Sequence, residues 1–277
     1  MPARPTDVTS PAVDVAKVAS LAALVGVMIP LLILPLASIF LFGTSKGLDA
    51  FWSALTEPAA LFSLKLSVAT STATTLFNLL FGLFAAYVLT KYSFPGRNTV
   101  TILISLPTAI PTAVVGFALL LLWGPYGLLG RYLVGTDIRV MFTTAAIILA
   151  NVFVTFPLAF GTIKPVLESL DRVYEDAAET IGATRWQTFR HVTLPALRGA
   201  LITGALLTFA RSIGEFGSTI LVSGNLTLRT QTAPLYIFTK FNEGDVEGAN
   251  AVAIVLALLS FGIFSLIFLA KERFERR

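Results

Sequence analysis

Five long stretches of the chain carry no ionisable side chain, and they constrain the fold more than any other feature. A helix needs about 20 apolar residues to cross the hydrocarbon core of a bilayer, and each stretch is longer than that. In lipid only helices and closed barrels satisfy their own backbone hydrogen bonds, and barrel strands would alternate in polarity. The sequence therefore predicts a helical membrane protein, with spans in residues 18–42, 66–90, 98–130, 140–163 and 248–270.

A sixth span is expected over residues 200–222, where Arg211 and Glu215 interrupt an otherwise apolar run. The first run contains two prolines and exceeds the about 7–15 residues of a signal-peptide core, so we expect a retained helix. The expected fold is all-α with six transmembrane helices. Residues 1–16 are polar and proline-bearing, and we expect them to form a disordered tail.

The distribution of basic residues predicts the orientation in the membrane. If both termini are cytoplasmic, the inner segments hold the larger share of the 20 Lys and Arg residues. Cytoplasmic loops are enriched in Lys and Arg, so both termini are expected on the cytoplasmic side. The pI of about 9.5 then reflects orientation rather than nucleic-acid binding.

Arg211 and Glu215 lie on one face of the predicted fifth span. Each charge costs roughly 2.5–3.5 kcal/mol at mid-bilayer, so the two should pair or face the bundle interior. They form either a structural ion pair or part of an anion pathway, in which Arg211 attracts the anion and Glu215 keeps it from being trapped. Prolines in the spans, Pro157 among them, free backbone carbonyls and either kink the helices or serve packing. The candidate pathway residues are Arg211, Glu215, Ser212, Pro107 and Pro111.

One sizeable inner segment, residues 164–194, is much less hydrophobic than its surroundings. Gly182 is expected to end an amphipathic helix here, and a second short helix is expected to end before Pro195. The segment either rests on the membrane surface or offers a helix to a groove on a partner protein, and its acidic face favours the protein. The apolar face of the first helix follows helical spacing through Leu167, Leu170, Tyr174, Ala177, Ala178 and Ile181.

A spaced motif runs through this segment. Asp176-Ala177-Ala178 is followed after three residues by Gly182 and, nine residues later, by Val192-Thr193-Leu194-Pro195. The pattern resembles the Glu-Ala-Ala signature of ABC-importer permeases, with Asp for Glu at 176 and Val for Ile at 192. In that family the segment forms the coupling helix that docks into the ATPase subunit. The resemblance implies a coupling role for Glu175, Asp176, Ala177, Ala178, Gly182, Ala183, Leu194 and Pro195.

Other stretches resemble one branch of that family. Residues 210–217 (ARSIGEFG), with Ser223-Gly224-Asn225, are similar to sulfate and molybdate permeases. Phe94-Pro95-Gly96, residues 106–114 and residues 124–130 are similar to the T subunit of sulfate/thiosulfate permeases more than to its W partner. The additional first helix also fits the sulfate branch. The resemblance covers residues 18–270 and leaves molybdate or tungstate as alternatives to sulfate or thiosulfate.

The resemblance implies a type I ABC importer permease in the bacterial cytoplasmic (plasma) membrane. It divides the chain into a tail (1–16), a first transmembrane helix with an outer loop (17–60), a permease core (61–270) containing a coupling segment (164–195), and a basic tail (271–277). It implies two ATPase subunits, a second permease that is a W-type homologue or a copy of this chain, and a periplasmic or lipid-anchored oxyanion-binding protein. The chain itself would bind no cofactor and no nucleic acid, since ATP and Mg²⁺ would be used by the ATPase.

Three other classes compete with this one. An intramembrane hydrolase would use Gly43-Thr44-Ser45-Lys46-Gly47, but that loop is predicted on the opposite side of the membrane from the one histidine, His191. An ion-coupled secondary transporter would need no docking segment, and no inverted repeat is evident. The third is a non-transporting membrane anchor. With one His and no Cys, neither a metal site nor catalytic residues are expected.

Overall fold

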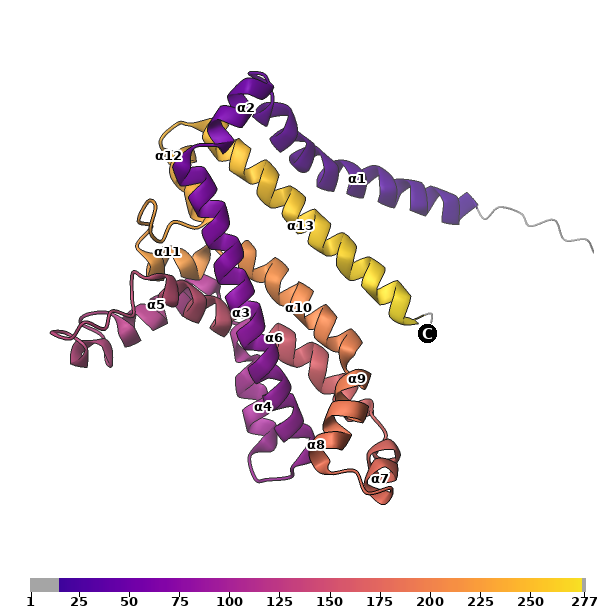
Figure 1. Cartoon of the computed structure of the whole chain (residues 1–277). Helices are drawn as coiled ribbons and strands as arrows, with labels where there is room; N and C mark the ends of the chain where they lie inside the picture. Colours follow the sequence, from indigo (N-terminus) through magenta and orange to yellow (C-terminus); the bar gives the residue numbers. More distant parts are fainter. Residues whose placement is uncertain (1–14, 276–277) are drawn as a thin grey trace, which may run out of the picture.

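The structure, a computed structural model, describes residues 15–275 as a series of helices (Figure 1). No β-strand occurs in this range. The first two residues of α1 belong to the expected disordered tail, and the rest of that tail lies outside the described residues. In chain order the helices are α1 (Val15–Gly43), α2 (Leu48–Leu55), α3 (Pro58–Lys91), α4 (Arg97–Ser105), η1 (Leu106–Thr108), α5 (Thr112–Trp123), η2 (Gly130–Tyr132), α6 (Thr144–Ser169), α7 (Arg172–Thr180), α8 (Arg185–Thr188), η3 (Phe189–Thr193), α9 (Leu194–Ala196), α10 (Arg198–Ile213), α11 (Gly217–Ser223), α12 (Ala233–Asn242) and α13 (Val246–Glu275).

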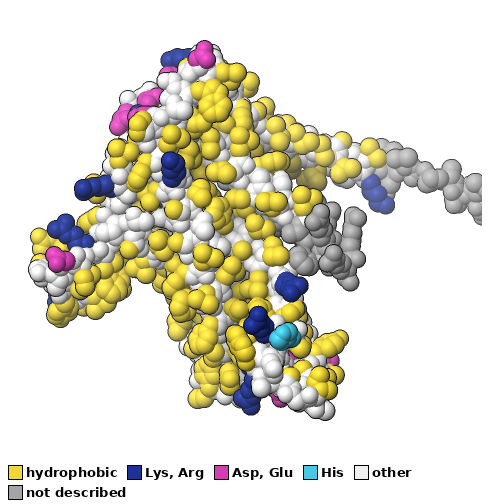
Figure 2. Space-filling model, viewed as in Figure 1, with side chains coloured by type: hydrophobic (Ala, Val, Ile, Leu, Met, Phe, Trp, Pro, Cys, Tyr) yellow, Lys and Arg dark blue, Asp and Glu magenta, His cyan; other side chains and the backbone are white. Residues whose placement is uncertain are grey.

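Within the described residues, four helices are long and apolar enough to cross a membrane: Lys17–Gly43, Pro58–Lys91, Thr144–Ser169 and Val246–Leu266. Two bent helix pairs bring the number to six if each pair is one span. All six overlap the predicted spans, so the all-α membrane fold is confirmed. Figure 2 shows hydrophobic side chains over most of the visible surface, with charged side chains mainly toward its two ends.

The third predicted span, residues 98–130, is not one continuous helix in the structure. The stretch formed by α4 and η1 meets α5 at an angle of 109°, and α5 ends at Trp123. Pro107 and Pro111 lie at this bend, and neither has the N–H that a continuous helix would use. Pro157, by contrast, lies inside α6, which continues to Ser169. The prolines of the third span therefore bend the chain, whereas the proline of α6 is accommodated.

The predicted fifth span, residues 200–222, is also divided into two helices. Helix α10 ends at Ile213, and α11 begins at Gly217 after a short turn. The start of α10 is bent by 64° from the α8–α9 stretch before it. Arg211 thus lies in the last turn of α10, and Glu215 lies in the turn between the two helices.

Helices α3, α6 and α10 pack against one another at the centre of the molecule (Figure 1). Glycines permit the close approach: a Cβ on Gly204 of α10 would lie 2.5 Å from Thr162 Oγ1 of α6. Helix α3 buries a row of polar side chains, of which Asn78 donates to Thr155 Oγ1 of α6 at 2.8 Å. In lipid, small side chains and hydrogen bonds drive the association of helices. Apolar contact alone gives little preference for another helix over the lipid tails.

Helix α1 lies largely apart from this centre (Figure 1). At its C-terminal end, Gly43 packs so closely on α13 that a Cβ there would lie 2.5 Å from Ile254 Cδ1. Along the rest of α1 the large apolar side chains are exposed, from Val18 to Phe42. This surface suits hydrocarbon surroundings and not water.

Candidate functional site

The segment between α6 and α10 forms one end of the molecule, which we call the α7 end (Figure 1). Its first helix is shorter than predicted. Leu167 is buried in the last turn of α6, and Leu170 has an extended backbone that ends α6. Asp171 then starts a new helix, because its side chain accepts a hydrogen bond from Val173 N at 3.0 Å. The expected amphipathic helix from Leu167 is therefore wrong at its start, and only α7 (Arg172–Thr180) carries the pattern.

Gly182 ends this helical segment in the manner that the sequence predicts. Its φ is +90°, a left-handed conformation that residues with a Cβ adopt at a cost. The amides that follow the helix return to it, since Gly182 N donates to Glu179 O and Ala183 N donates to Ala178 O. A capping box between Thr184 and Gln187 then starts α8.

The second predicted helix is built of three pieces, α8, η3 and α9, of which η3 is a π-helical turn. This helix was expected to end before Pro195, but Pro195 lies within α9. Because Pro195 has no N–H, the carbonyl four residues before it loses its helical partner, and a π-turn is one local adjustment to such a loss. The chain then bends at Leu197 into α10.

The surface of the α7 end exposes a cluster of large apolar side chains, which we call the apolar cluster. Four large apolar side chains are exposed by 63% or more: Val173, Tyr174, Ile181 and Trp186. In Figure 2 hydrophobic side chains lie beside acidic ones at the lower right of the molecule, where Figure 1 places α7. Exposed apolar clusters rimmed by polar groups mark sites that contact a protein or a membrane.

The predicted coupling residues fall into two groups. Asp176, Ala177 and Gly182 are exposed beside the apolar cluster. The others are half-buried and lie toward the body of the molecule: Glu175, Ala178, Ala183, Leu194 and Pro195. Only the first group is thus available to a partner that approaches the α7 end.

Arg211 and Glu215 form the ion pair that their spacing indicates. Arg211 donates to Glu215 Oε2 at 2.6 Å, while Ser218 donates to Oε1 through both its backbone N and its Oγ at 2.9 Å. The carboxylate therefore also caps the first turn of α11, whose amides have no hydrogen-bond partner within the helix. The side chain of Glu215 is 1% exposed, whereas that of Arg211 is 43% exposed. Glu215 is thus fully engaged, and Arg211 keeps further N–H donors free for another group.

The remaining pathway candidates differ in how near they lie to the Arg211–Glu215 pair. Helix α5, which follows Pro111, packs on α11, where a Cβ on Gly116 would lie 2.6 Å from Ser218 O. Ser212 is buried, and its Oγ has no hydrogen-bond partner among the described residues. Pro107 lies in η1, which packs on α6 rather than on α11. The structure therefore brings Pro111's helix to the Arg211–Glu215 pair and keeps Pro107 apart from it.

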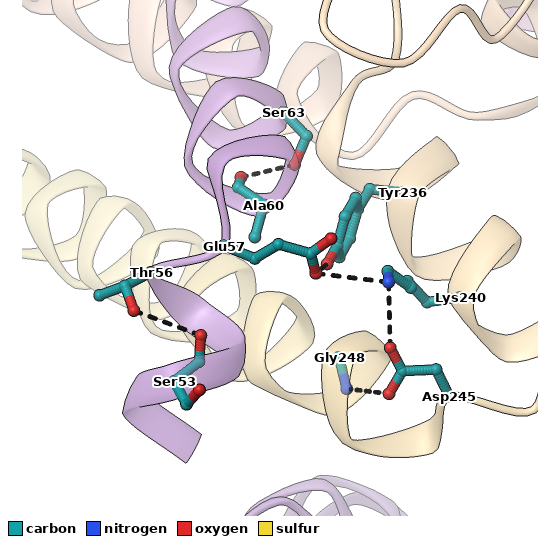
Figure 3. Close-up of polar contacts among 9 residues, drawn as sticks. All are labelled: Ser53, Thr56, Glu57, Ala60, Ser63, Tyr236, Lys240, Asp245 and Gly248. Atoms are coloured by element: carbon teal, nitrogen blue, oxygen red, sulfur yellow. Dashed lines mark hydrogen bonds and ion pairs between the residues drawn. The ribbon is translucent and has the colours of Figure 1, made fainter. Parts of the chain in front are cut away.

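A polar cluster that the sequence did not predict lies at the other end of the molecule (Figure 3). Glu57 Oε2 accepts from the Tyr236 hydroxyl at 2.7 Å and from Lys240 Nζ at 3.3 Å. Lys240 also pairs with Asp245 at 3.1 Å, and Asp245 accepts from Gly248 N at the start of α13. Glu57 is distant from the others in sequence, so no local pattern indicates this cluster. It joins the start of α3 to α12 and α13.

The electrostatics of this cluster favour a neutral Tyr236 and the charged forms of Lys240 and Asp245. Burial and the hydrogen bond to Glu57 raise the pKa of Tyr236 well above its ordinary value. Burial alone would lower the pKa of Lys240, but its hydrogen bonds to Asp245 and Glu57 raise it on balance. The hydrogen bond from Gly248 N, with Lys240 nearby, lowers the pKa of Asp245.

Replacing Asp245 with alanine is expected to destabilise the protein by about 1 kcal/mol, the usual cost of losing a helix cap. Thermal unfolding in detergent measures this. Glu247→Ala is the matched control, because its ion pair with Lys46 is largely exposed and contributes little. The pKa of Asp245 is lowered, so its contribution is present above pH 3.8 and is lost as the pH falls through the lowered value. An equal effect of both substitutions at pH 7 would contradict this assignment.

Comparison with known proteins identifies the class to which this bundle of membrane helices belongs. The chain belongs to the family of binding-protein-dependent transport system inner membrane components, whose profile matches residues 78–277. It is 39% identical over 247 residues to the sulfate transport system permease protein CysT of Escherichia coli (strain K12), which covers 89% of each chain. It is 36% identical over 250 residues to the permease protein CysW of Synechocystis sp., which covers 90% of this chain and 89% of that one.

Solved structures agree on the fold. The chain superimposes with a TM-score of 0.77 and 19% identity on a bacterial ABC transporter involved in alginate import, over 95% of this chain and 96% of that one. The MetNI methionine ABC transporter gives a TM-score of 0.55 with 19% identity, over 80% of this chain and 98% of that one. The fold is therefore that of a type I ABC importer permease. The chain is a multi-pass membrane transport subunit that works with partner subunits; it is not an enzyme and binds no cofactor itself.

The hydrolase alternative fails on geometry as well as on family. Ser45 lies beside α2, and His191 lies in η3 at the opposite end of the molecule (Figure 1). His191 Nδ1 instead contacts Gln187 O at 2.9 Å on the exposed surface. The two side chains cannot form the couple that a serine nucleophile needs.

Proposed function

We propose that this chain is the channel-forming subunit of an ABC importer for sulfate and thiosulfate. The relatives named as sulfate transport permeases, which it matches over most of its length, support the substrate. Arg211 supports an anionic cargo, because a partly free guanidinium beside a candidate membrane span is suited to an oxyanion. Molybdate or tungstate is the alternative cargo of the same chemistry.

ATP and Mg²⁺ are used by two separate ATPase subunits that bind the α7 end. The observation that carries this proposal is the exposed apolar cluster of α7 and α8 beside Asp176, Ala177 and Gly182. An amphipathic helix presents such a face to a groove on a partner. Because the ATPases are in the cytoplasm, the α7 end and both termini are cytoplasmic, which agrees with the distribution of Lys and Arg.

In the pathway, Arg211 contacts the passing oxyanion and Glu215 holds the guanidinium in place. The buried carboxylate also reduces the net attraction, so that the anion is released rather than trapped. Ser212 is adjacent to Arg211 in the chain, and Pro111 precedes α5, the helix that packs on α11. Pro107 has a structural role in the bend. A second permease, W-type or a copy of this chain, completes the pathway, and an oxyanion-binding protein delivers the cargo from outside.

The proposed division of the chain follows from these roles. Residues 17–60 supply the first transmembrane helix and an outer loop, and residues 61–270 supply the permease core. Segment 164–195 is the coupling segment of that core. Residues 1–16 and 271–277 are cytoplasmic tails, and residues 271–275 of the second form the end of α13.

The substrate is tested by uptake of radiolabelled sulfate into vesicles that contain the complete complex, with the binding protein outside. Thiosulfate is expected to compete at a concentration similar to that of sulfate, and molybdate only at a large excess. Uptake of molybdate without uptake of sulfate would contradict the proposed cargo while leaving the permease role in place.

A further inference from the structure

Helix α7 contributes no side chain to the buried apolar core of the described residues. None of its residues is buried, and Ala178 is half-buried. Its exposed side chains, Val173 and Tyr174 among them, point away from the bundle into the surface described above. If α7 moves the bundle, it must transmit force to it. The contacts that α7 makes with other helices determine the route of that force.

Those contacts converge on one carboxylate. Glu175 Oε2 forms an ion pair with Lys91 Nζ, and Glu175 Oε1 accepts a hydrogen bond from Thr193 Oγ1 at 2.7 Å. Lys91 is the last residue of α3, and Thr193 is the last residue of η3. Among the described residues, every side-chain hydrogen bond or ion pair between α7 and another helix involves Glu175. The contact spans three segments that are far apart in the sequence.

The burial of the groups makes this contact firm. The side chains of Glu175 and Lys91 are 16% and 14% exposed, and Thr193 is buried. Salt screens ion pairs held away from water less than exposed ones. Removing one partner of such a pair is strongly destabilising, because the other charge is left without its counter-charge. Beside them Phe189 stacks on Trp186 and meets Tyr87 of α3 edge-on, with ring centroids 5.6 and 5.5 Å apart.

Both anchors of Glu175 belong to the rigid part of the bundle. Leu89, near Lys91 in α3, packs in one apolar cluster with Leu167 of α6 and Leu197 at the base of α10. Thr193 is joined through α9 to α10, whose last turn carries Arg211. A displacement of α7 therefore reaches α3 directly and α10 through η3 and α9 by way of this one side chain, in addition to the backbone connections of α7 to α6 and α8.

We propose that Glu175 is a positioning residue that transmits movement of α7 to α3 and α10 through Lys91 and Thr193, and that it does not contact the ATPase. This inference rests on the proposed function, because it takes α7 to be the helix that the ATPase moves. It separates Glu175 from its neighbour Asp176, which is exposed and faces the partner. Loss of the contact leaves docking intact and uncouples hydrolysis from transport.

The test uses the complete complex with three readouts: co-purification of the ATPase, stimulation of ATP hydrolysis by the loaded binding protein, and sulfate imported per ATP hydrolysed. Glu175→Gln and Lys91→Met are each expected to retain the ATPase and to lose at least tenfold in sulfate imported per ATP. The double variant is expected to be no worse than either single one, because both remove the same contact. Thr193→Val is expected to lower the ratio, and Thr193→Ser is expected to restore it.

The matched control is the Lys46–Glu247 pair, which has the same chemistry but lies outside segment 164–195. Lys46→Met and Glu247→Gln are expected to change the ratio less than twofold. Dissociation of the ATPase from Glu175→Gln, with Lys91→Met unaffected, would overturn the proposal by making Glu175 a docking residue. An unchanged ratio in Glu175→Gln, Lys91→Met and Thr193→Val would overturn it as well. If the wild-type complex itself imports no sulfate, the proposed function fails instead, and the wild-type arm identifies that outcome.

Discussion

Replacing Ala177 with arginine is expected to lower sulfate uptake by the assembled importer at least about 100-fold, which corresponds to about 2.7 kcal/mol. Ala177 is exposed on α7, so the larger side chain does not disturb the packing of the permease itself. In the proposed interface it enters the groove of the ATPase, where an unpaired buried charge costs about 3–5 kcal/mol. Co-purification of the ATPase with the permease, together with uptake, measures the effect.

Ser93→Arg is the control for this substitution. Ser93 is exposed in the turn that follows α3, outside segment 164–195. Its replacement is expected to leave uptake within twofold of the wild type. Normal uptake and normal ATPase retention in Ala177→Arg would remove the docking role from α7.

Arg211→Ala is expected to produce the second large effect, a loss of both stability and transport. The substitution leaves the carboxylate of Glu215, with 1% of its side chain exposed, without its counter-charge. Breaking a fully buried pair costs about 3–5 kcal/mol, and the cost here is smaller because the Arg211 side chain is 43% exposed. The melting temperature of the purified protein in detergent measures the stability, and uptake in vesicles measures the transport.

The double variant Arg211→Gln with Glu215→Gln separates the two roles that the sequence left open. It keeps polar side chains at both positions and removes both charges. The melting temperature is therefore expected to recover most of the decrease caused by Arg211→Ala. Uptake is expected to remain at least tenfold below the wild type, because no guanidinium is left for the oxyanion. If uptake recovers together with the melting temperature, the pair is structural only.

The sequence predicted those features that depend on local pattern. Charge-free length located the spans, because the bilayer imposes a minimum on every crossing helix. Gly182 was predicted to end its helix, and its φ of +90° gives the physical reason. The spacing of Arg211 and Glu215 left an ion pair as one of two alternatives, and the pair forms between the last turn of α10 and the turn that follows it.

Features that depend on contacts between distant residues were not predicted. The carboxylate of Glu175 meets Lys91 across 84 positions, and Glu57 meets Tyr236 across 179, with no periodicity to indicate either contact. The break in the third span was left open, because a proline inside a predicted span is compatible with both outcomes. Pro111 precedes a bend of 109°, whereas Pro157 lies within a continuous α6, and the packing around each decides the difference.

The central claim is that hydrolysis of ATP by a separate subunit drives an oxyanion through this chain. The most direct test is uptake of labelled sulfate into vesicles containing the full complex, with ATP, with a non-hydrolysable ATP analogue, and with a proton uncoupler. The account predicts uptake that requires hydrolysable ATP and continues in the presence of the uncoupler. Uptake that proceeds without ATP and stops with the uncoupler would contradict it and would make the chain an ion-coupled transporter.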